Sequence, residues 1–228
     1  MVKVEDAVKD AVNGARRVLI GAACIAMVGC AGVQPVAYSG IDSSSHLKTN
    51  TQDTSGRIPY RYSTQVDWRS YTKVIVDPVT IYRGPDNQFG DLRDADKTTL
   101  ADYMKTTFVD KLGKRFTVAS AAGPNTMRVK LTLTGAETTT PVLGPVSRFD
   151  IAGGLYNGVQ AIRGGKGSFT GSITYAVEVY DAPSGRLLDA YVTKQYPNAM
   201  NIGAAFGSLG AAKTGIDKGA DAFLAGLN

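Results

Sequence analysis

Cysteine, histidine and tryptophan are scarce in this chain. Its 228 residues include two Cys, one His and one Trp. A Ser/His/Asp triad or a Cys/His pair needs a histidine, and the single one, His46, lies in a polar stretch where a solvated side chain is the ordinary outcome. Zinc sites draw mainly on Cys and His ligands. The composition therefore predicts a protein that is not an enzyme and that uses no metal or cofactor.

A long apolar run and a block of like charge are also missing. The apolar stretch from Val18 to Val28 has eleven residues, whereas a membrane-spanning helix needs about 20. The formal net charge of +5 comes from 25 basic and 20 acidic residues that are spread along the chain. Nucleic-acid-binding segments usually concentrate their basic residues. We expect no nucleic-acid partner.

The short apolar stretch has the flanks of a secretory signal peptide. Arg16 and Arg17 precede it, and the small Gly29 followed by Cys30 comes directly after it. A basic region, an apolar region of about 7 to 15 residues and a small-residue cleavage point define such a peptide. The junction resembles the lipobox of bacterial lipoproteins, in which a peptidase cuts before a lipid-bearing cysteine. We expect residues 1–29 to be removed and Cys30 to carry a diacylglyceryl anchor.

Two alternatives compete with this interpretation. Cys24 is a rival lipid acceptor, but only six apolar residues separate it from Arg17. The stretch could instead be a buried helix of the domain, and the leader is long and contains three acidic residues. We prefer Cys30, whose lipidation leaves the mature chain without a cysteine for a disulfide. Since Ala31 rather than Asp follows Cys30, we expect an outer-membrane lipoprotein that faces the periplasm.

The composition divides the remaining chain into a tether and a domain. Residues 31–57 are rich in Ser, Thr, Gly and other polar residues and show neither helical nor strand periodicity. Such segments are typically extended and mobile. We therefore expect residues 30–57 to form a flexible tether and residues 58–228 to form the globular domain.

The domain alternates strand and helix signals. Residues 71–82 predict a strand that bends or breaks at Pro78, and Leu100, Met104, Phe108 and Leu112 give the next segment a buried helical stripe. Residues 127–135 alternate apolar and polar side chains, which predicts a strand with Arg128, Lys130, Thr132 and Thr134 on a wet face. A hairpin over 167–196 turns at residues 181–185, and a helix over 211–227 follows. This order predicts an α+β fold with two helices on one face of a mixed, largely antiparallel sheet.

Several of these segments together resemble one known family. They include the strand TKVIVDPVTIY, the helix and strand from LADYMKTTFVDKL to MRVKLTLT, and the hairpin ITYAVEVYDAPSGRLLDA. The chain is similar over these segments to bacterial lipoproteins of the domain-of-unknown-function 3313 family. The resemblance implies an envelope lipoprotein of α+β fold and brings no catalytic residues with it.

Other candidate sites are weak. The acidic loop residues Asp86, Asp91, Asp94 and Asp96 lack the spacing of a calcium loop, and a polar lead into the helix explains them better. The stretch RGGKGS, residues 163–168, departs from a phosphate-binding loop at two positions and precedes a strand. Nothing singles out a catalytic pair among Glu137, Glu178 and the other carboxylates.

Glycine is unusually frequent in residues 151–171 and 202–219. Because glycine inside an element is destabilising, this frequency indicates close backbone approach. The two segments could pack inside the molecule, or they could present an exposed apolar surface, for which the candidate residues are Leu155, Tyr156, Val159, Ile162 and Phe206. We therefore expect a structural or protein-interaction module, with an envelope protein as a possible partner. The alternative is a module that binds a small apolar ligand between sheet and helices.

Overall fold

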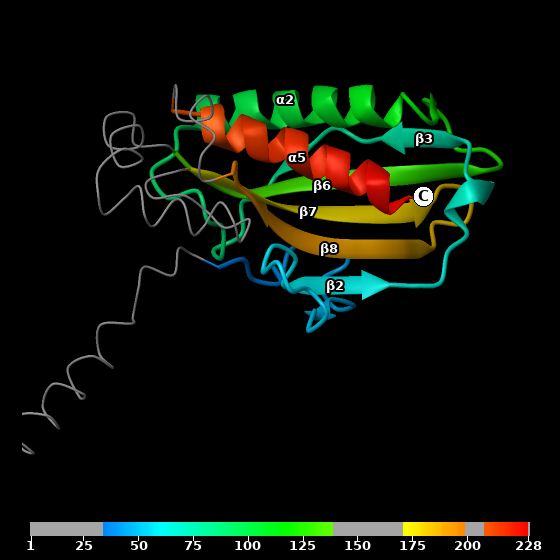
Figure 1. Ribbon diagram of the computed structural model, residues 1–228, viewed down its shortest axis with the longest axis horizontal. Coiled ribbons are helices and arrows are strands. Elements are labelled where there is room, and N and C mark those ends of the chain that lie inside the picture. The colour runs from blue at the N-terminus through cyan, green and yellow to red at the C-terminus, as the bar shows by residue number, and fades with distance from the viewer. Residues whose placement is uncertain (1–33, 139–170, 199–207, 228) are drawn as a thin grey trace, which may run out of the picture. The chain divides into compact units, whose positions relative to one another are not determined.

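The computed structural model describes residues 34–138, 171–198 and 208–227. A compact unit begins at Pro35. Its described part contains, in chain order, β1 (Lys48–Thr49), β2 (Tyr60–Ser63), a 3-10 helix (Trp68–Ser70), β3 (Lys73–Val76), β4 (Thr80–Ile81), α2 (Asp94–Leu112), β5 (Thr117–Val118), β6 (Thr126–Glu137), β7 (Ser172–Asp181), β8 (Leu187–Gln195) and α5 (Gly210–Gly226). Helices α2 and α5 lie side by side over one face of the sheet (Figure 1).

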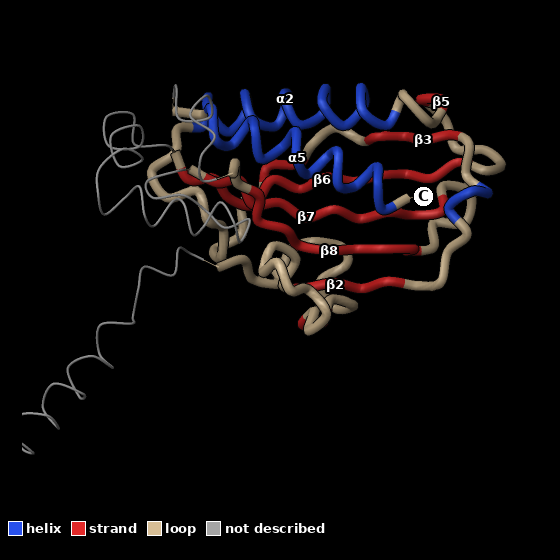
Figure 2. Tube along the Cα trace, viewed as in Figure 1, coloured by secondary structure: helices blue, strands red, loops and turns tan. Residues whose placement is uncertain are grey.

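The strands of the described part join in one mixed sheet. Its order is β1-β2-β8-β7-β6-β3-β5, and β4 also pairs with β6 (Figure 2). The pairs formed by β3 with β5, by β3 with β6 and by β4 with β6 are parallel, while the others are antiparallel. The predicted α+β fold, with two helices on one face of a largely antiparallel sheet, is confirmed.

The predicted break at Pro78 is also confirmed. β3 ends at Val76 and β4 begins at Thr80, and both run parallel to β6. Proline cannot donate a backbone hydrogen bond, so the ladder is interrupted where it stands. The interrupted strand continues along the same neighbour. This continuation brings Tyr82 beside the second half of β6, where the Tyr82 N–H donates to the Leu133 carbonyl at 2.8 Å.

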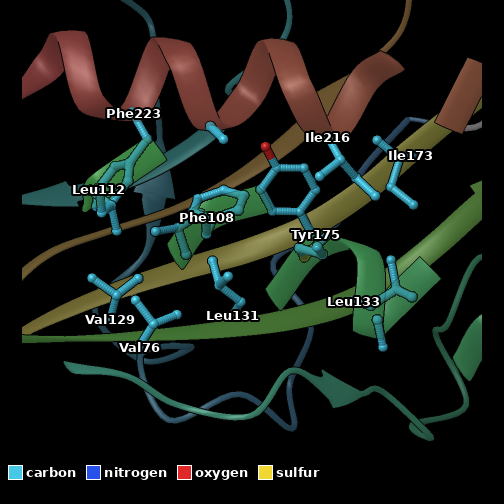
Figure 3. Close-up of a cluster of buried hydrophobic side chains, with 14 of the residues drawn as sticks. Val76, Phe108, Leu112, Val129, Leu131, Leu133, Ile173, Tyr175, Ile216 and Phe223 are labelled. Atoms are coloured by element: carbon cyan, nitrogen blue, oxygen red, sulfur yellow. The ribbon is translucent and has the colours of Figure 1, made fainter. Parts of the chain in front are cut away.

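The main core lies between the sheet and the two helices. The predicted stripe of α2 is confirmed, because Leu100, Met104, Phe108 and Leu112 are all fully buried. Figure 3 shows Phe108 beside Tyr175 of β7, and their ring centroids are 6.1 Å apart in an edge-to-face arrangement. On α5, Ile216, Ala220 and Phe223 are buried. The helical and strand periods of the sequence therefore identify this core correctly.

The opposite face of the sheet differs from the prediction. Arg128 and Lys130 of β6 are partly exposed, but Thr132 and Thr134 are buried and not solvated as expected. The wet face therefore covers only the first half of the strand. Its second half is covered by an N-terminal segment that the sequence places in the tether.

That segment is packed and is not a flexible tether over residues 38–57. Tyr38, Ile41 and Ser43 are 1%, 6% and 1% exposed, and Tyr38 and Ile41 form a second apolar cluster with Tyr82, Ala176 and Val192. We call residues 38–47 the strap. Polar composition misleads here because several polar groups of the strap, such as the Ser43 N–H and the Asp42 carboxylate, bond to partners far along the chain.

Two glycines let α5 lie close to the sheet. A Cβ on Gly215 would stand 2.8 Å from Ile173 Cγ2 and 2.9 Å from the Gln195 carbonyl oxygen. A Cβ on Gly219 would overlap the Tyr175 hydroxyl. The two residues are one helical turn apart, so both bare positions face β7 and β8. Close backbone approach is therefore the reason for glycine at these two positions of the 202–219 segment.

We expect Gly219→Ala to lower the free energy of unfolding by about 1 to 3 kcal/mol, because the added methyl forces α5 away from Tyr175. The matched control is Gly226→Ala in the same helix, where a Cβ would meet nothing within 4 Å. That variant should be unchanged or stabilised by less than about 1 kcal/mol. Urea unfolding of both variants measures the difference, and equal stabilities would contradict the close approach.

Candidate functional site

Buried polar contacts hold the strap on the sheet. The Ser43 N–H donates to Glu178 Oε1 at 2.6 Å, and both residues are almost fully buried. The Tyr38 hydroxyl donates to Gln88 Oε1 at 2.8 Å. The Gly40 N–H donates to the Tyr82 hydroxyl at 3.2 Å. Hydrogen bonds to a buried carboxylate are among the stronger ones in proteins, so Glu178 is the main polar attachment of the strap.

Tyr38 is the point at which the strap enters the domain. Its ring meets Tyr82 edge to face, with centroids 5.4 Å apart, and burial raises the pKa of its hydroxyl to about 12. The backbone φ of Tyr38 is 45°, which is in the left-handed region that residues other than glycine rarely adopt. Surrounding contacts must stabilise such a conformation. The packed ring therefore fixes the backbone turn that opens the strap.

A cavity lies between the strap and the sheet, on the face opposite the helices. Its volume is about 410 Å³, and its walls include residues 40–42 of the strap, the chain around Pro78, and Lys130, Thr132 and Glu178. We call it the outer cavity. Lys130 Nζ donates to Asp42 Oδ2 at 2.8 Å, and this hydrogen bond raises the pKa of the lysine. The outer cavity is therefore polar and carries both signs of charge.

A smaller pocket lies on the helix side of the sheet. Its volume is about 90 Å³, and Trp68, Tyr175, Asp189 and Phe223 are among its lining residues. Asp189 is buried and accepts two hydrogen bonds from Arg61, at 2.9 and 3.1 Å. Burial raises the pKa of this carboxyl, and the guanidinium opposes the shift. The pair joins β2 to β8 at the mouth of the pocket.

Three of the four acidic loop residues, Asp86, Asp94 and Asp96, have partners within the protein, although no side chain caps the start of α2. Asp86 accepts from the Tyr82 hydroxyl at 2.6 Å and from the strap through the Ser39 N–H at 3.3 Å. Asp94 pairs with Lys97, and Asp96 pairs with Arg93, each at 2.9 Å. No group of three or more potential metal ligands gathers among the residues that the structure describes. The contacts of Asp86 attach the strap, a role that sequence spacing did not indicate.

The predicted site residues lie outside the described ranges. These are the lipid acceptor Cys30 and the candidate surface residues Leu155, Tyr156, Val159, Ile162 and Phe206. Among described residues, the large hydrophobic side chains that are exposed are Val36 and Val118. Within the same ranges, no helix combines the length and the apolar character that spanning a membrane requires. His46 is exposed, and its ring lies 5.1 Å from that of Tyr62.

Sequence patterns missed the strap and the two cavities. The only signals for them are single polar residues inside strands, such as Glu178 among the apolar residues of β7 and Asp189 near the start of β8. A charged residue in a buried strand normally has a partner. The partners, Ser43 and Arg61, lie more than 120 residues away in the chain, and no local pattern connects them.

Comparison with known families identifies the chain. The family described as "Protein of unknown function (DUF3313)" matches residues 37–223, and the chain belongs to this family. The match begins one residue before Tyr38, so the strap is part of the family's domain. Among curated proteins, none matches the sequence.

Solved structures show only distant likeness. A PelC variant dodecamer from Paraburkholderia phytofirmans is 11% identical with a TM-score of 0.36, and the match covers 69% of this chain and 89% of that one. A second PelC dodecamer from the same organism is 12% identical with a TM-score of 0.34, covering 65% and 86%. A neuraminyllactose-binding hemagglutinin homolog from Helicobacter pylori is 8% identical with a TM-score of 0.29, covering 58% and 66%. We draw nothing about this chain from likeness at this level.

We expect Glu178→Ala to lower the free energy of unfolding by about 1.5 to 3 kcal/mol, because it leaves the buried Ser43 N–H without its acceptor. Hydrogen exchange of the Ser43 amide should accelerate at the same time. The matched control is Asp42→Ala, which removes the more exposed ion pair with Lys130 and should cost at most about 1 kcal/mol. If the two variants behave alike, Glu178 does not hold the strap.

Proposed function

We propose that this chain is a lipid-anchored lipoprotein of the cell envelope. The observation that carries the proposal is the junction of Gly29 and Cys30 directly after the basic pair and eleven apolar residues. Acyl chains contribute about 0.8 kcal/mol per buried methylene, so two or three chains anchor a protein stably. Ala31 after the cysteine favours the outer membrane, with the domain in the periplasm.

In this proposal the domain acts as a structural or protein-interaction module. The packed core between sheet and helices supports this role, since its helix-side pocket of about 90 Å³ is well below the 300 Å³ or more of ordinary small-molecule sites. A protein partner in the envelope would recognise the outside of the domain and need no internal cavity. The candidate surface residues for such a partner remain those of the two glycine-rich segments.

We expect Cys30→Ser to accumulate as a precursor that retains residues 1–29 and takes up no palmitate label, because the lipid acceptor and the cleavage point are lost together. Cys24→Ser is the matched control and should be processed normally. Intact-mass measurement and labelling of the membrane fraction distinguish the two variants. A wild-type mature chain that begins at any residue other than a lipid-bearing Cys30 would refute the proposal.

A second candidate function is the binding of a small ligand. The size of the outer cavity, about 410 Å³, favours it, since ligand sites commonly have about 300 to 1,000 Å³. The lining carries Asp42, Lys130, Thr132 and Glu178, so a ligand in this cavity would be polar and would not be the small apolar molecule expected from the sequence. It would also lie on the face of the sheet opposite the helices.

Ligand-observed NMR with a panel of sugars, amino acids and amines tests this candidate. We expect a compound that binds the wild-type protein to show no magnetisation transfer from the Thr80→Trp variant. An indole at this exposed wall position would fill part of the outer cavity. Thr72→Trp is the control, since Thr72 is also exposed and does not line the outer cavity. Binding that Thr80→Trp leaves intact would place the ligand elsewhere.

A further inference from the structure

The packed strap shortens the free chain between the proposed anchor and the domain. The sequence alone predicts a tether that reaches residue 57. Tyr38, however, is already 1% exposed and hydrogen-bonded to Gln88. Only residues 31–37 separate it from Cys30. A chain spans at most about 3.6 Å per residue, so the lipidated Cys30 lies within about 29 Å of Tyr38.

The point of attachment lies at one end of the sheet. Gln88, the partner of Tyr38, bridges to Gly135 near the end of β6. At the other end of β6, Met127 pairs with Asp181, where the turn from β7 to β8 begins. The chain from Met127 to Gly135 spans about 27 Å at strand geometry. In Figure 1 the described chain enters on the side of the sheet opposite to the β7–β8 turn.

We infer that the strap end of the domain, marked by Tyr38, Arg83 and Gln88, is the surface that the protein presents to the lipid bilayer. The inference rests on the proposed lipidation of Cys30. A link of at most about 29 Å is only slightly longer than the roughly 27 Å from Gly135 to Met127. The far end therefore reaches the bilayer only when the link is almost fully extended, whereas the strap end reaches it at any extension.

Charge on the described residues does not supply this orientation. At the strap end these residues carry both signs, with the exposed Arg83 and Arg93 near the half-buried Asp86 and the exposed Asp91 and Asp94. An anionic membrane attracts concentrated basic residues, and these are interspersed with acids. The covalent link is therefore the orienting force, and the orientation should be insensitive to salt.

Energy transfer to labelled lipid tests the orientation on the full, lipidated protein. The lipidated chain has no free cysteine, so one engineered cysteine takes one donor dye. Arg83→Cys marks the strap end, and Arg186→Cys makes the same change at the β7–β8 turn; both side chains are exposed. The proteins are reconstituted in phosphatidylethanolamine and phosphatidylglycerol vesicles that contain acceptor-labelled lipid. We expect at least twofold higher transfer efficiency from position 83, unchanged when the salt is raised to about 1 M, where the Debye length is about 3 Å.

A lengthened link is the control. Inserting twenty Gly and Ser residues between Gln34 and Pro35 adds up to about 70 Å of chain, so transfer from position 83 should fall to that from position 186. Equal transfer from the two positions in a protein whose mass confirms the lipid overturns the inference and leaves the anchor in place. A protein that carries no lipid overturns the proposed function and the inference together. A difference that disappears in salt shows that charge orients the domain, and this also overturns the inference.

Discussion

Burial of β7 on both faces is the constraint on which the rest of the structure depends. Ile173, Tyr175, Val177 and Val179 lie beneath the helices, while Thr174, Ala176 and Glu178 point the other way and are buried too. A strand buried on both sides needs two covers. On one side α5 approaches closely at two glycines, and on the other side the strap brings a backbone N–H to the Glu178 carboxylate. Both covers come from chain segments distant from β7 in sequence.

The difference between the two covers explains how much of the fold the sequence could predict. Helix α2 and strand β6 show their core-facing sides through local periods. The sequence therefore correctly predicts the buried stripe of α2 and the buried apolar residues of β6, which are Met127, Val129, Leu131 and Leu133. The strap has no period, because its few apolar residues, Tyr38, Ile41 and Leu47, meet one small cluster while the Ser43 N–H and other polar groups bond to distant partners. Composition describes such a segment as a tether. Only Glu178, the hydrogen-bond partner of Ser43, could have indicated that the strap is packed. Its position in an apolar strand does not say which N–H donates to it.

The candidate sites follow the same division. Spacing alone argues against a calcium loop among the acidic residues before α2, and two of these residues, Asp94 and Asp96, form local ion pairs with Lys97 and Arg93. The outer cavity could not be predicted, since its wall is the strap and its floor combines residues of β6 and β7. The helix-side pocket depends on the pairing of Arg61 with Asp189 across β2 and β8. Such sites arise from tertiary contacts, which spacing within one element does not report.

The strap has two roles that meet at Tyr38. It covers the outer face of the sheet, and it is the part of the domain through which the chain from Cys30 enters. Any pull between an anchored Cys30 and the domain therefore acts first on the contacts of Tyr38 with Tyr82 and Gln88. A left-handed backbone turn and a buried ring at this position hold the entry point in place, so in the proposed lipoprotein the link between Cys30 and the domain stays short.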